Sequence, residues 1–507
     1  MADKTAIAEA LEREVGKLIR RHSKSTAASA HNQKKYQKRS GQPGAPPASL
    51  VPPHWALNPH FNPYHVRARI QSFSHAIAKK IRTSSYEPNP SLLLPIPKPG
   101  GGSREISIST VPDAAVAYWL GSRLIKRNSY RFSSYTYAYR ADRNAHHAIE
   151  HLMANIRGHT RLFVLEYDFA KYFDSIRHDY LYRILDDHFL VSPRELHLLK
   201  TFLTNRHAKS LRDYQAGTFV PRTVGIPQGS NISLFLANVA CFELDREIEQ
   251  VGVTFARYAD DTLIVCDDYH KADACAKILL SHGDRSGTQI NFAKSPGISL
   301  LTPDTNAELR HKNAVDFLAH SLSPAGVGIS AIAICRIKRR VATIIYNNLL
   351  LQPKRGKVNP ERLGTGFSDW DLVTCVNELR RYIYGRISDK ALSLALSGIG
   401  PVNVTLCAMS FYPTGDSRAQ PQLKSLDGWL VDVLARAYEK RRKILKDLGL
   451  AAAPISRKKL ITGAWYSFQE VPVETKLPSS YRAWRYVRKA ADVFGLEKFP
   501  SPTYEYQ

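Results

Sequence analysis

The sequence predicts an α+β protein with a helical C-terminal region. Between Leu92 and about Leu322, short apolar runs alternate with turns and helical segments. After Gly328 the apolar spacing becomes helical, and further helices are predicted at Asp369 to Tyr384 and at Leu426 to Leu448. Hydrophobic residues make up 44% and charged residues 23% of the chain, as in globular proteins, and no fixed-period repeat supports a solenoid.

The charge of the chain indicates a polyanionic partner. Its 71 basic and 45 acidic residues give a net charge of +26, and nucleic acid is the usual partner of so basic a protein. No apolar run approaches the length of a membrane span, and the N-terminus carries acidic residues and lacks the apolar core of a secretory signal. The six cysteines include no CxxC pair, which favours buried reduced thiols over zinc ligands or disulfides. We therefore expect a cytoplasmic protein without membrane association.

The N-terminal part of the chain concentrates this basic charge. Val15 to Tyr86 contains thirteen Lys or Arg and no Asp or Glu. One helix is predicted at its start, where Ile7, Leu11, Val15 and Ile19 share a face, and another at Tyr64 to Thr83. Residues 23 to 63 are rich in Ser, Ala, Gln, Pro and Gly, which favours an extended arm. We expect residues 1–63 to contact RNA phosphates, although a solvated basic tail is the alternative.

Acidic residues at strand ends suggest metal chemistry. Asp168 ends the apolar run FVLEYD, ahead of a helix predicted from His178. Asp260 and Asp261 lie in YADD, in the turn of a predicted strand-turn-strand unit. Carboxylates beside apolar strands are costly unless they are paired or bind a cation, and oxygen ligands suit Mg²⁺. Two such ions about 4 Å apart can hold the attacking and leaving oxygens of a phosphoryl displacement.

Seven collinear segments of the chain resemble the sequence blocks of reverse transcriptases. In order they are LLLPIPKPGGGSREISISTVPD, YAYRADRNAHHAIEHL, VLEYDFAKYFDSI, GIPQGSNISLFLANVACFELD, YADD, INFAKSPGISL and VDFLAHSLS. The resemblance implies a right-hand polymerase fold with fingers and palm at residues 64–325, a helical thumb at 326–400 and a helical basic C-terminal region at 401–507. The implied enzyme is an RNA-directed DNA polymerase, a nucleotidyltransferase that uses dNTPs, an RNA template and two Mg²⁺ ions, with Mn²⁺ as the alternative.

The resemblance also assigns roles to individual residues. Asp168, Asp260 and Asp261 would be catalytic metal ligands, helped by the Phe169 carbonyl. Phe173 resembles a steric gate against a ribose 2′-OH, with core packing as its alternative role. The nucleotide would also meet Gln228 and Gly229, cations at Lys98 and Arg104 in the Gly-rich turn, and a proton donor at Lys294. Lys98, Arg104 and Lys294 could instead be solvated surface charges without a nucleotide contact.

Three further residues near these blocks are assigned structural roles. Asp174 in YFDSI is predicted to cap the following helix and not to bind metal. His146 and His147 fall in a helical run and are interpreted as helix surface or packing residues.

The type of reverse transcriptase is suggested by what surrounds the blocks. WDLVTCVNELRRYIYG and LDGWLVDVLARAYEKRRKIL distantly resemble the thumb and maturase helices of group II intron enzymes. The chain resembles stand-alone bacterial enzymes of the unknown-group or defence-associated type, which implies a structured noncoding RNA partner, a cDNA product and protection against phage. The alternatives are a maturase-like RNA-binding protein with a vestigial polymerase site, and RNA-dependent RNA synthesis, which Phe173 disfavours. A homo-oligomer stays open, and so does protein priming by Tyr504 or Tyr506 in the C-terminal KFPSPTYEYQ.

Overall fold

The chain forms two compact units. The computed structural model describes residues 4–44, 50–97, 101–304, 309–363, 369–466 and 473–501. The first unit comprises Met1–Ala28, Ala48–Ala141 and Leu162–Leu300, and the second Ser29–Pro47, Asp142–Arg161 and Leu301–Gln507. Helices and mainly antiparallel sheets occur together, which confirms the predicted α+β class. The functional boundaries at residues 63, 325 and 400 stay a prediction.

The first unit contains most of the strands. Its helices are α2 (Pro63–Arg67), α3 (Ile70–Arg82), α4 (Val111–Asn128), α6 (Tyr172–Ser175), α7 (His178–His188), α8 (Pro193–Leu203), α9 (Leu211–Gln215), α10 (Asn231–Ala240), α11 (Phe242–Val251) and α12 (Tyr269–Ser286). Its strands are β1 (Ser91–Pro97), β2 (Ser103–Ile108), β3 (Leu162–Tyr167), β4 (Arg206–Ala208), β5 (Val220–Pro221), β6 (Thr254–Tyr258), β7 (Asp261–Cys266) and β8 (Gly297–Leu301). The helix predicted from His178 is confirmed as α7.

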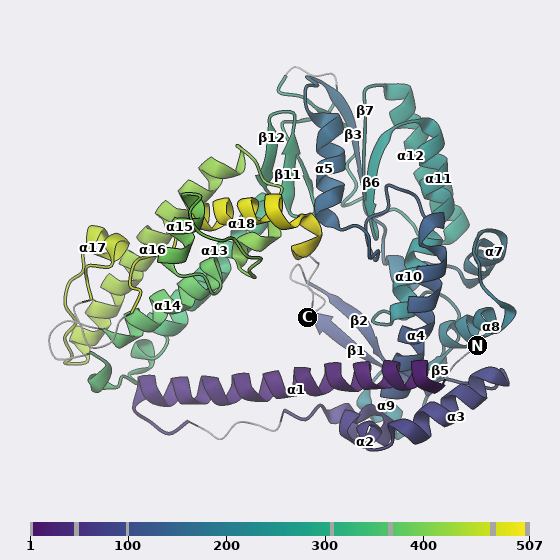
Figure 1. Ribbon diagram of the computed structural model, residues 1–507, viewed down its shortest axis with the longest axis horizontal. Helices are drawn as coiled ribbons and strands as arrows, with labels where there is room; N and C mark the ends of the chain where they lie inside the picture. The colour runs from purple at the N-terminus through teal and green to yellow at the C-terminus, as the bar shows by residue number, and fades with distance from the viewer. Residues whose placement is uncertain are drawn as a thin grey trace. The chain divides into compact units, whose positions relative to one another are not determined.

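The central sheet of the first unit has the strand order β6-β7-β3-β8. β7 pairs antiparallel with both neighbours, so that Thr262 faces Arg257 on one side and Tyr167 on the other. The β-branched and aromatic residues of these strands suit a pleated sheet, and helices α11 and α12 lie beside it (Figure 1). This register brings the end of β3 next to the β6–β7 turn.

Strands β1 and β2 flank the Gly-rich turn. β1 and β2 pair antiparallel from Leu92↔Ile108 to Pro97↔Ser103, and the sheet continues through β4 and β5. Trp55, Phe61 and Tyr214 are buried against its base. Arg104 lies on β2 opposite Ile96, whereas Lys98 lies outside the described residues.

The prediction of an extended arm at residues 23 to 63 is wrong as far as Ser40, because these residues are helical. Helix α1 runs from Lys4 to Ser40 as one element (Figure 1). No Gly or Pro interrupts the chain between Lys17 and Ser40, and the helix ends where Gly41 takes a φ of +68°. Ile7, Leu11 and Val15 are buried, as the amphipathic pattern predicts. The second predicted N-terminal helix corresponds to α2 and α3.

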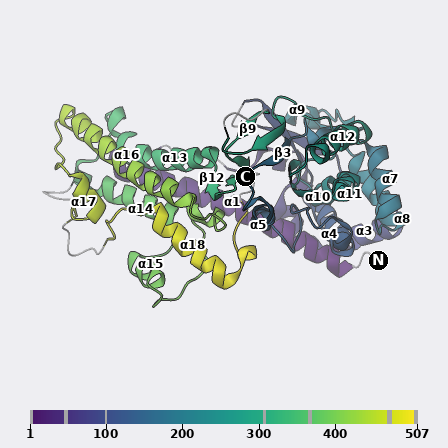
Figure 2. The ribbon, with the colours of Figure 1, turned by 90° about the horizontal axis from the view of Figure 1, so that it is seen from above.

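The second unit is mainly helical. It contains α5 (Ala145–Ile156), α13 (Ala331–Ile345), α14 (Trp370–Tyr384), α15 (Asp389–Leu396), α16 (Ala419–Asp447), α17 (Arg457–Thr462) and α18 (Ser480–Phe494), with strands β9 (His311–Lys312), β10 (Val315–Phe317), β11 (His320–Ser323) and β12 (Gly326–Ile329). Helices α13, α14, α16 and α18 pack side by side over one apolar core (Figure 2). The helical C-terminal region is therefore confirmed, with α16 beginning seven residues before the predicted Leu426.

The two ends of helix α1 belong to different units, and the C-terminal end is held by polar contacts. Lys4 to Ala28 count with the first unit, whereas Ser29 to Ser40 count with the second. In the second unit, the buried Arg39 donates to the Asn347 carbonyl at 2.7 Å and to the Asn348 side chain. Lys35 forms an ion pair with Glu378. These contacts hold the last turns of α1 in place as packed structure.

The remaining sequence expectations concern thiols and membranes. All six cysteines are reduced; five are buried, as predicted, and Cys335 is exposed. Across the described ranges, no helix has both the length and the hydropathy that spanning a bilayer requires.

Candidate active site

The YADD segment forms a tight hairpin turn. Tyr258 at the end of β6 pairs with Asp261 at the start of β7, so that Ala259 and Asp260 are the two turn residues. Ala259 has a φ of +60°, a region that residues with a Cβ seldom adopt. The predicted strand-turn-strand unit is confirmed, and it presents Asp260 and Asp261 next to β3.

Asp168 follows β3 and is held by the segment that leads to β8. The Asp168 N–H donates to the Ser295 hydroxyl at 3.0 Å, and the Asp168 carbonyl accepts from the Asn291 N–H at 2.8 Å. Lys294 Nζ lies 3.3 Å from Asp168 Oδ2, with 71% of the lysine side chain exposed. The structure thus brings Lys294 to a predicted catalytic carboxylate.

The Asp168 charge acts on the Asp260 carboxyl. Burial raises the pKa of the Asp260 carboxyl, and the negative charge of Asp168 adds to this rise, while Arg104 and Lys294 act in the opposite sense. A buried carboxylate beside another carboxylate is stabilised by a cation between them. The pair thus has the hard oxygen chemistry that suits Mg²⁺.

The three predicted carboxylates do not form a complete metal cage. Within the described part of the chain, no three His, Cys, Asp or Glu side chains gather closely enough to hold a metal ion. Mg²⁺ usually takes only one or two protein carboxylates and completes its shell with water and substrate phosphates. Asp168 and Asp260 therefore fit such an ion, and the part of Asp261 stays a prediction.

Phe169 lies in a backbone bridge that positions its carbonyl. The bridge joins Phe169 to Ile290. Its hydrogen bonds run from the Asn291 N–H to the Asp168 carbonyl and from the Ala170 N–H to the Gln289 carbonyl, both at 2.8 Å. The Phe169 carbonyl is not used in this bridge, which is consistent with the predicted metal ligand.

The loop that contains Pro227, Gln228 and Gly229, here called the PQG loop, packs against the segment that follows β3. Phe173 is 8% exposed, and its carbonyl accepts from the Ile226 N–H at 2.6 Å. Gly225 has a φ of +81°, and a Cβ there would lie 2.7 Å from the Asp174 carbonyl oxygen. Phe173 is therefore both a packing residue and a neighbour of the predicted nucleotide contacts, so that its steric role stays a prediction.

Gln228 and Gly229 contact strand β2. The Gln228 carbonyl accepts from the Ser107 N–H at 2.9 Å. Gly229 has a φ of +110°, and a Cβ there would lie 3.2 Å from the Ser107 carbonyl oxygen. Glycine at position 229 therefore permits a close approach to β2, whereas its contact with a nucleotide stays a prediction.

The capping role predicted for Asp174 is wrong. Helix α7 begins after Arg177, which provides no side-chain cap, and Asp174 lies in the preceding short helix α6. The Asp174 carboxylate instead accepts from the Gln228 side-chain amide at 3.2 Å. Asp174 thus supports the PQG loop, a contact between segments far apart in sequence.

Three of the predicted site residues lie outside the described part of the chain, and the histidines of α5 have packing or capping roles. Lys98, Tyr504 and Tyr506 lie outside the described residues. His146 is buried and meets the Pro500 carbonyl at 3.0 Å, and burial lowers its pKa to about 3. His147 accepts from the Asn144 N–H in the capping box of α5. The interpretation of both histidines as helix or packing residues is confirmed.

Arg257 is a residue of this region that the sequence analysis missed. Its guanidinium is fully buried and forms an ion pair with Asp245 of α11 at 2.6 Å. It also donates to the Ala259 carbonyl in the YADD turn at 2.9 Å. A lone charged residue in the apolar run TFARY, directly before the acidic turn, was the available signal.

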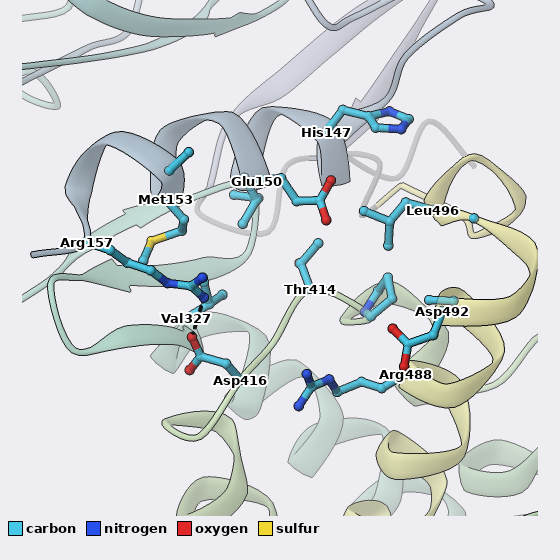
Figure 3. A pocket seen from close by; sticks show the side chains of 15 residues that line it. His147, Glu150, Met153, Arg157, Val327, Thr414, Asp416, Arg488, Asp492 and Leu496 are labelled. Carbon is cyan, nitrogen blue, oxygen red and sulfur yellow. Dashed lines mark hydrogen bonds and ion pairs between the residues drawn. The ribbon is translucent and has the colours of Figure 1, made fainter.

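A separate pocket lies within the second unit. It has a volume of about 530 Å³ and is lined by α5, α18 and the loop that contains Thr414 and Asp416. Figure 3 shows the Arg157–Asp416 ion pair at its wall, with an N–O distance of 3.0 Å. None of the predicted site residues lines this pocket.

Comparison with known proteins identifies the segment that contains the carboxylates. Residues 96–322 match the reverse transcriptase (RNA-dependent DNA polymerase) family. The reverse transcriptase segment covers less than half of the chain and includes β2, β3, the PQG loop and the YADD hairpin. The mixed α+β architecture fits the fingers, palm and thumb expected of such an enzyme.

Curated relatives align with about a third of the chain. Protein YkfC of Escherichia coli (strain K12) is 26% identical over 36% of this chain and 48% of its own length. A Schizosaccharomyces pombe protein, described as an uncharacterized 91 kDa protein in cob intron, is 28% identical over 35% of this chain and 21% of its own length. This chain therefore spans less than half of the length of either relative.

Solved telomerase structures share a weaker likeness. Telomerase from Candida albicans, in complex with a TWJ fragment of telomeric RNA, has 13% identity and a TM-score of 0.38, covering 81% of this chain and 68% of that one. Telomerase from Candida tropicalis has 10% identity and the same TM-score over 76% of this chain.

Proposed function

We propose that this protein is an RNA-directed DNA polymerase. The observation that carries the proposal is the electrostatically coupled pair Asp168 and Asp260, located at a strand end and a hairpin turn of a segment that matches reverse transcriptases. Phosphoryl transfer depends mainly on positioning and on charge stabilisation, which such a pair can organise.

The residues around the pair divide the work of nucleotide addition. Asp168 and Asp260, with Asp261 and the Phe169 carbonyl, would hold Mg²⁺, which supplies charge stabilisation to the attacking and leaving oxygens when it is bound. Arg104 and Lys294 bring positive charge to the same place and would meet the triphosphate. Lys294 is also the group that would give a proton to departing pyrophosphate. Phe173 would exclude the ribose 2′-OH.

The test of the proposal is primer extension by the purified full-length chain. A DNA primer annealed to RNA is incubated with Mg²⁺ and either dNTPs or rNTPs. We expect extension with dNTPs on the RNA template and little extension with rNTPs. Extension with rNTPs alone would support RNA-dependent RNA synthesis and contradict the proposal.

We infer that the exposed basic face of α1 contacts the RNA. Arg20, Arg21 and Lys24 are exposed, and the helix carries no acid after Glu14. Exchanging all three for glutamine should weaken RNA binding and lower the slope of log affinity against log salt by about 2 to 3, close to one for each lost phosphate contact. Deleting α1 is a less informative test, because Ile7 and Leu11 are buried in the core and their loss would also affect folding.

The matched control for α1 removes three cations that already have partners. Arg183, Arg246 and Lys277 are exposed and paired with Glu243, Glu249 and Asp273. Their exchange for glutamine should leave the salt slope nearly unchanged. Equal slopes for both triple variants, measured by filter binding over a salt series, would assign α1 another role.

We further propose that the template is an associated structured noncoding RNA and that its copying serves defence against phage. The support is the sequence resemblance to stand-alone bacterial reverse transcriptases, whose blocks cover about residues 90 to 325. Sequencing the RNA and DNA that copurify with the protein tests this directly. One abundant RNA with complementary DNA is the expected result, and a random RNA sample without DNA would contradict it.

The second candidate function is that of a maturase-like RNA-binding protein with little polymerase activity. The relative named for its place in the cob intron favours this candidate. It predicts tight binding of an intron-like RNA without DNA synthesis, whereas the retained Asp168, Asp260 and Asp261 favour the polymerase.

Protein priming is a separate prediction about the C-terminal tail. A tyrosine hydroxyl can attack the first dNTP if a base removes its proton, and Tyr504 and Tyr506 follow two prolines near the chain end. If they prime, the DNA product carries a tyrosine-linked 5′ nucleotide, detectable by mass spectrometry after protease digestion. The double variant Tyr504→Phe and Tyr506→Phe should then lose the product. A free 5′ end would assign these tyrosines no priming role.

A further inference from the structure

The Arg257 guanidinium connects the YADD turn to helices α10 and α11. Its Nε and Nη2 each lie 2.6 Å from a different carboxylate oxygen of Asp245 on α11. Nη1 donates to the Ala259 carbonyl at 2.9 Å and to the Asn238 side chain of α10 at 3.3 Å. The side chain is 0% exposed, so that these bonds form without competition from water.

The backbone around Arg257 is held as firmly as its side chain. The Arg257 N–H donates to the Tyr135 carbonyl, and its own carbonyl accepts from the Tyr137 N–H, both at 2.9 Å. Between them, Thr136 donates to Asp245 at 2.7 Å and accepts from Arg257 Nη2 at 3.2 Å. Segment 135–137, α10 and α11 therefore fix the strand that enters the turn.

The turn itself needs such support. Ala259 has a φ of +60°, whereas Asp260 is not among the described residues with positive φ, a pattern of type II′ turns, where glycine is usual at the first position. The Cβ of Ala259 makes this conformation strained, and strained backbone persists only where its surroundings hold it. The charge-assisted bond from Arg257 to the Ala259 carbonyl acts on the peptide unit that leads into Asp260.

We propose that Arg257 is a positioning residue that holds the Ala259 carbonyl and thereby sets the Asp260 carboxylate for cation binding. This inference rests on the proposed function, because it assigns a cation to the Asp168–Asp260 pair. Arg257 does not touch that pair through any described hydrogen bond of its side chain, and its effect passes through the turn backbone. Outer residues of this kind typically change metal affinity or activity about 10- to 100-fold when they are replaced.

A purely structural role is the competing explanation, and the chain offers a matched control for it. Arg441 in the second unit is also 0% exposed, and it forms ion pairs with Asp369 at 2.7 Å and Asp371 at 3.0 Å. Arg441→Lys and Arg257→Lys both keep the charge and lose the planar fork that bonds several acceptors at once. Both should lower thermal stability, but only Arg257→Lys should alter cation binding.

The experiment measures Mn²⁺ binding to the full-length chain by the loss of the electron paramagnetic resonance signal of free Mn²⁺. Wild type, Arg257→Lys and Arg441→Lys are compared below their unfolding temperatures, and primer extension over a Mg²⁺ series is measured alongside. We expect Arg257→Lys to weaken Mn²⁺ binding about 10-fold or more and to raise the Mg²⁺ concentration for half-maximal rate. Arg441→Lys should match wild type in both measurements.

A rescue variant tests the turn directly. Glycine adopts positive φ without strain, so Ala259→Gly combined with Arg257→Lys should recover part of the lost Mn²⁺ affinity. If Arg257→Lys does not fold, Thr136→Val is used, because it removes one acceptor of Arg257 and keeps the ion pair with Asp245. It should weaken Mn²⁺ binding in the same direction but less.

The outcomes separate this inference from the proposed function. Wild-type Mn²⁺ affinity in folded Arg257→Lys or in its substitute Thr136→Val, or an equal loss in Arg441→Lys, overturns the positioning role while the polymerase proposal stands. A wild-type chain that neither binds Mn²⁺ nor extends a primer overturns the proposed function and, with it, this inference.

Discussion

Replacing Asp260 by asparagine should reduce RNA-templated DNA synthesis by about 10²-fold or more, the usual effect of losing one charge-stabilising element of an active site. Asparagine keeps the size of the side chain but removes the charge that is coupled to Asp168. Because Asp260 lies in a turn whose backbone is fixed by Arg257, the fold should survive the exchange. The measurement is the rate of dNTP incorporation at saturating template.

Asp267→Asn is the matched control for this prediction. Asp267 directly follows β7 and is exposed, so that the same charge is lost outside the turn. We expect its rate to equal that of wild type. A fully active Asp260→Asn variant would contradict the assignment of the carboxylates.

Replacing Phe173 by alanine should admit ribonucleotides. Phe173 is 8% exposed, and its ring packs edge-on against the Tyr172 ring beside the PQG loop, with 5.5 Å between the ring centroids. Removing it opens space where a ribose 2′-OH would otherwise collide, and the ratio of rNTP to dNTP incorporation should rise about 10- to 100-fold, the range of a steric pocket. The ratio is measured by single-nucleotide addition with matched dNTP and rNTP.

The exchange also removes buried apolar surface, which typically costs about 3–5 kcal/mol for phenylalanine. Phe235→Ala controls for this loss, because Phe235 is 1% exposed and packs with Phe132 and Phe189 in the same unit. It should lower stability without changing sugar selection. If Phe173→Ala leaves the ratio unchanged, or if both variants change it alike, Phe173 is a packing residue only.

Local patterns were sufficient to predict the strands that carry the carboxylates. The short apolar runs FVLEYD and TFARYADDTLIVC, the second interrupted by an acidic turn, correspond to β3, β6 and β7. Their order along the chain does not reveal their pairing. The antiparallel register that brings Tyr167 opposite Thr262, and hence Asp168 near Asp260, depends on long-range contacts.

The N-terminal helix shows how composition can mislead. Residues 23 to 40 are polar and contain few large apolar side chains, so that their composition suggested an extended arm. Tertiary anchors decided otherwise, because Arg39 is buried against Asn347 and Asn348. The absence of Gly and Pro between Lys17 and Ser40 was a valid helix signal that composition outweighed.

Contacts between distant segments were beyond the reach of sequence reasoning. Asp174 was predicted to cap a helix because the residues that follow it suit one, yet its carboxylate bonds the Gln228 amide. Arg257 meets Asp245, Asn238 and Thr136 only after three segments have packed together. Such partners follow from the tertiary fold and not from local preference.

We propose that this chain copies RNA into DNA at the Asp168–Asp260 pair. The most direct measurement is run-off synthesis on an RNA of defined sequence by wild type and Asp260→Asn side by side, with the product sequenced. We expect Mg²⁺-dependent DNA complementary to the RNA from wild type, and about 10²-fold less or none from the variant. RNA products, untemplated DNA, or equal yields from both proteins would contradict it.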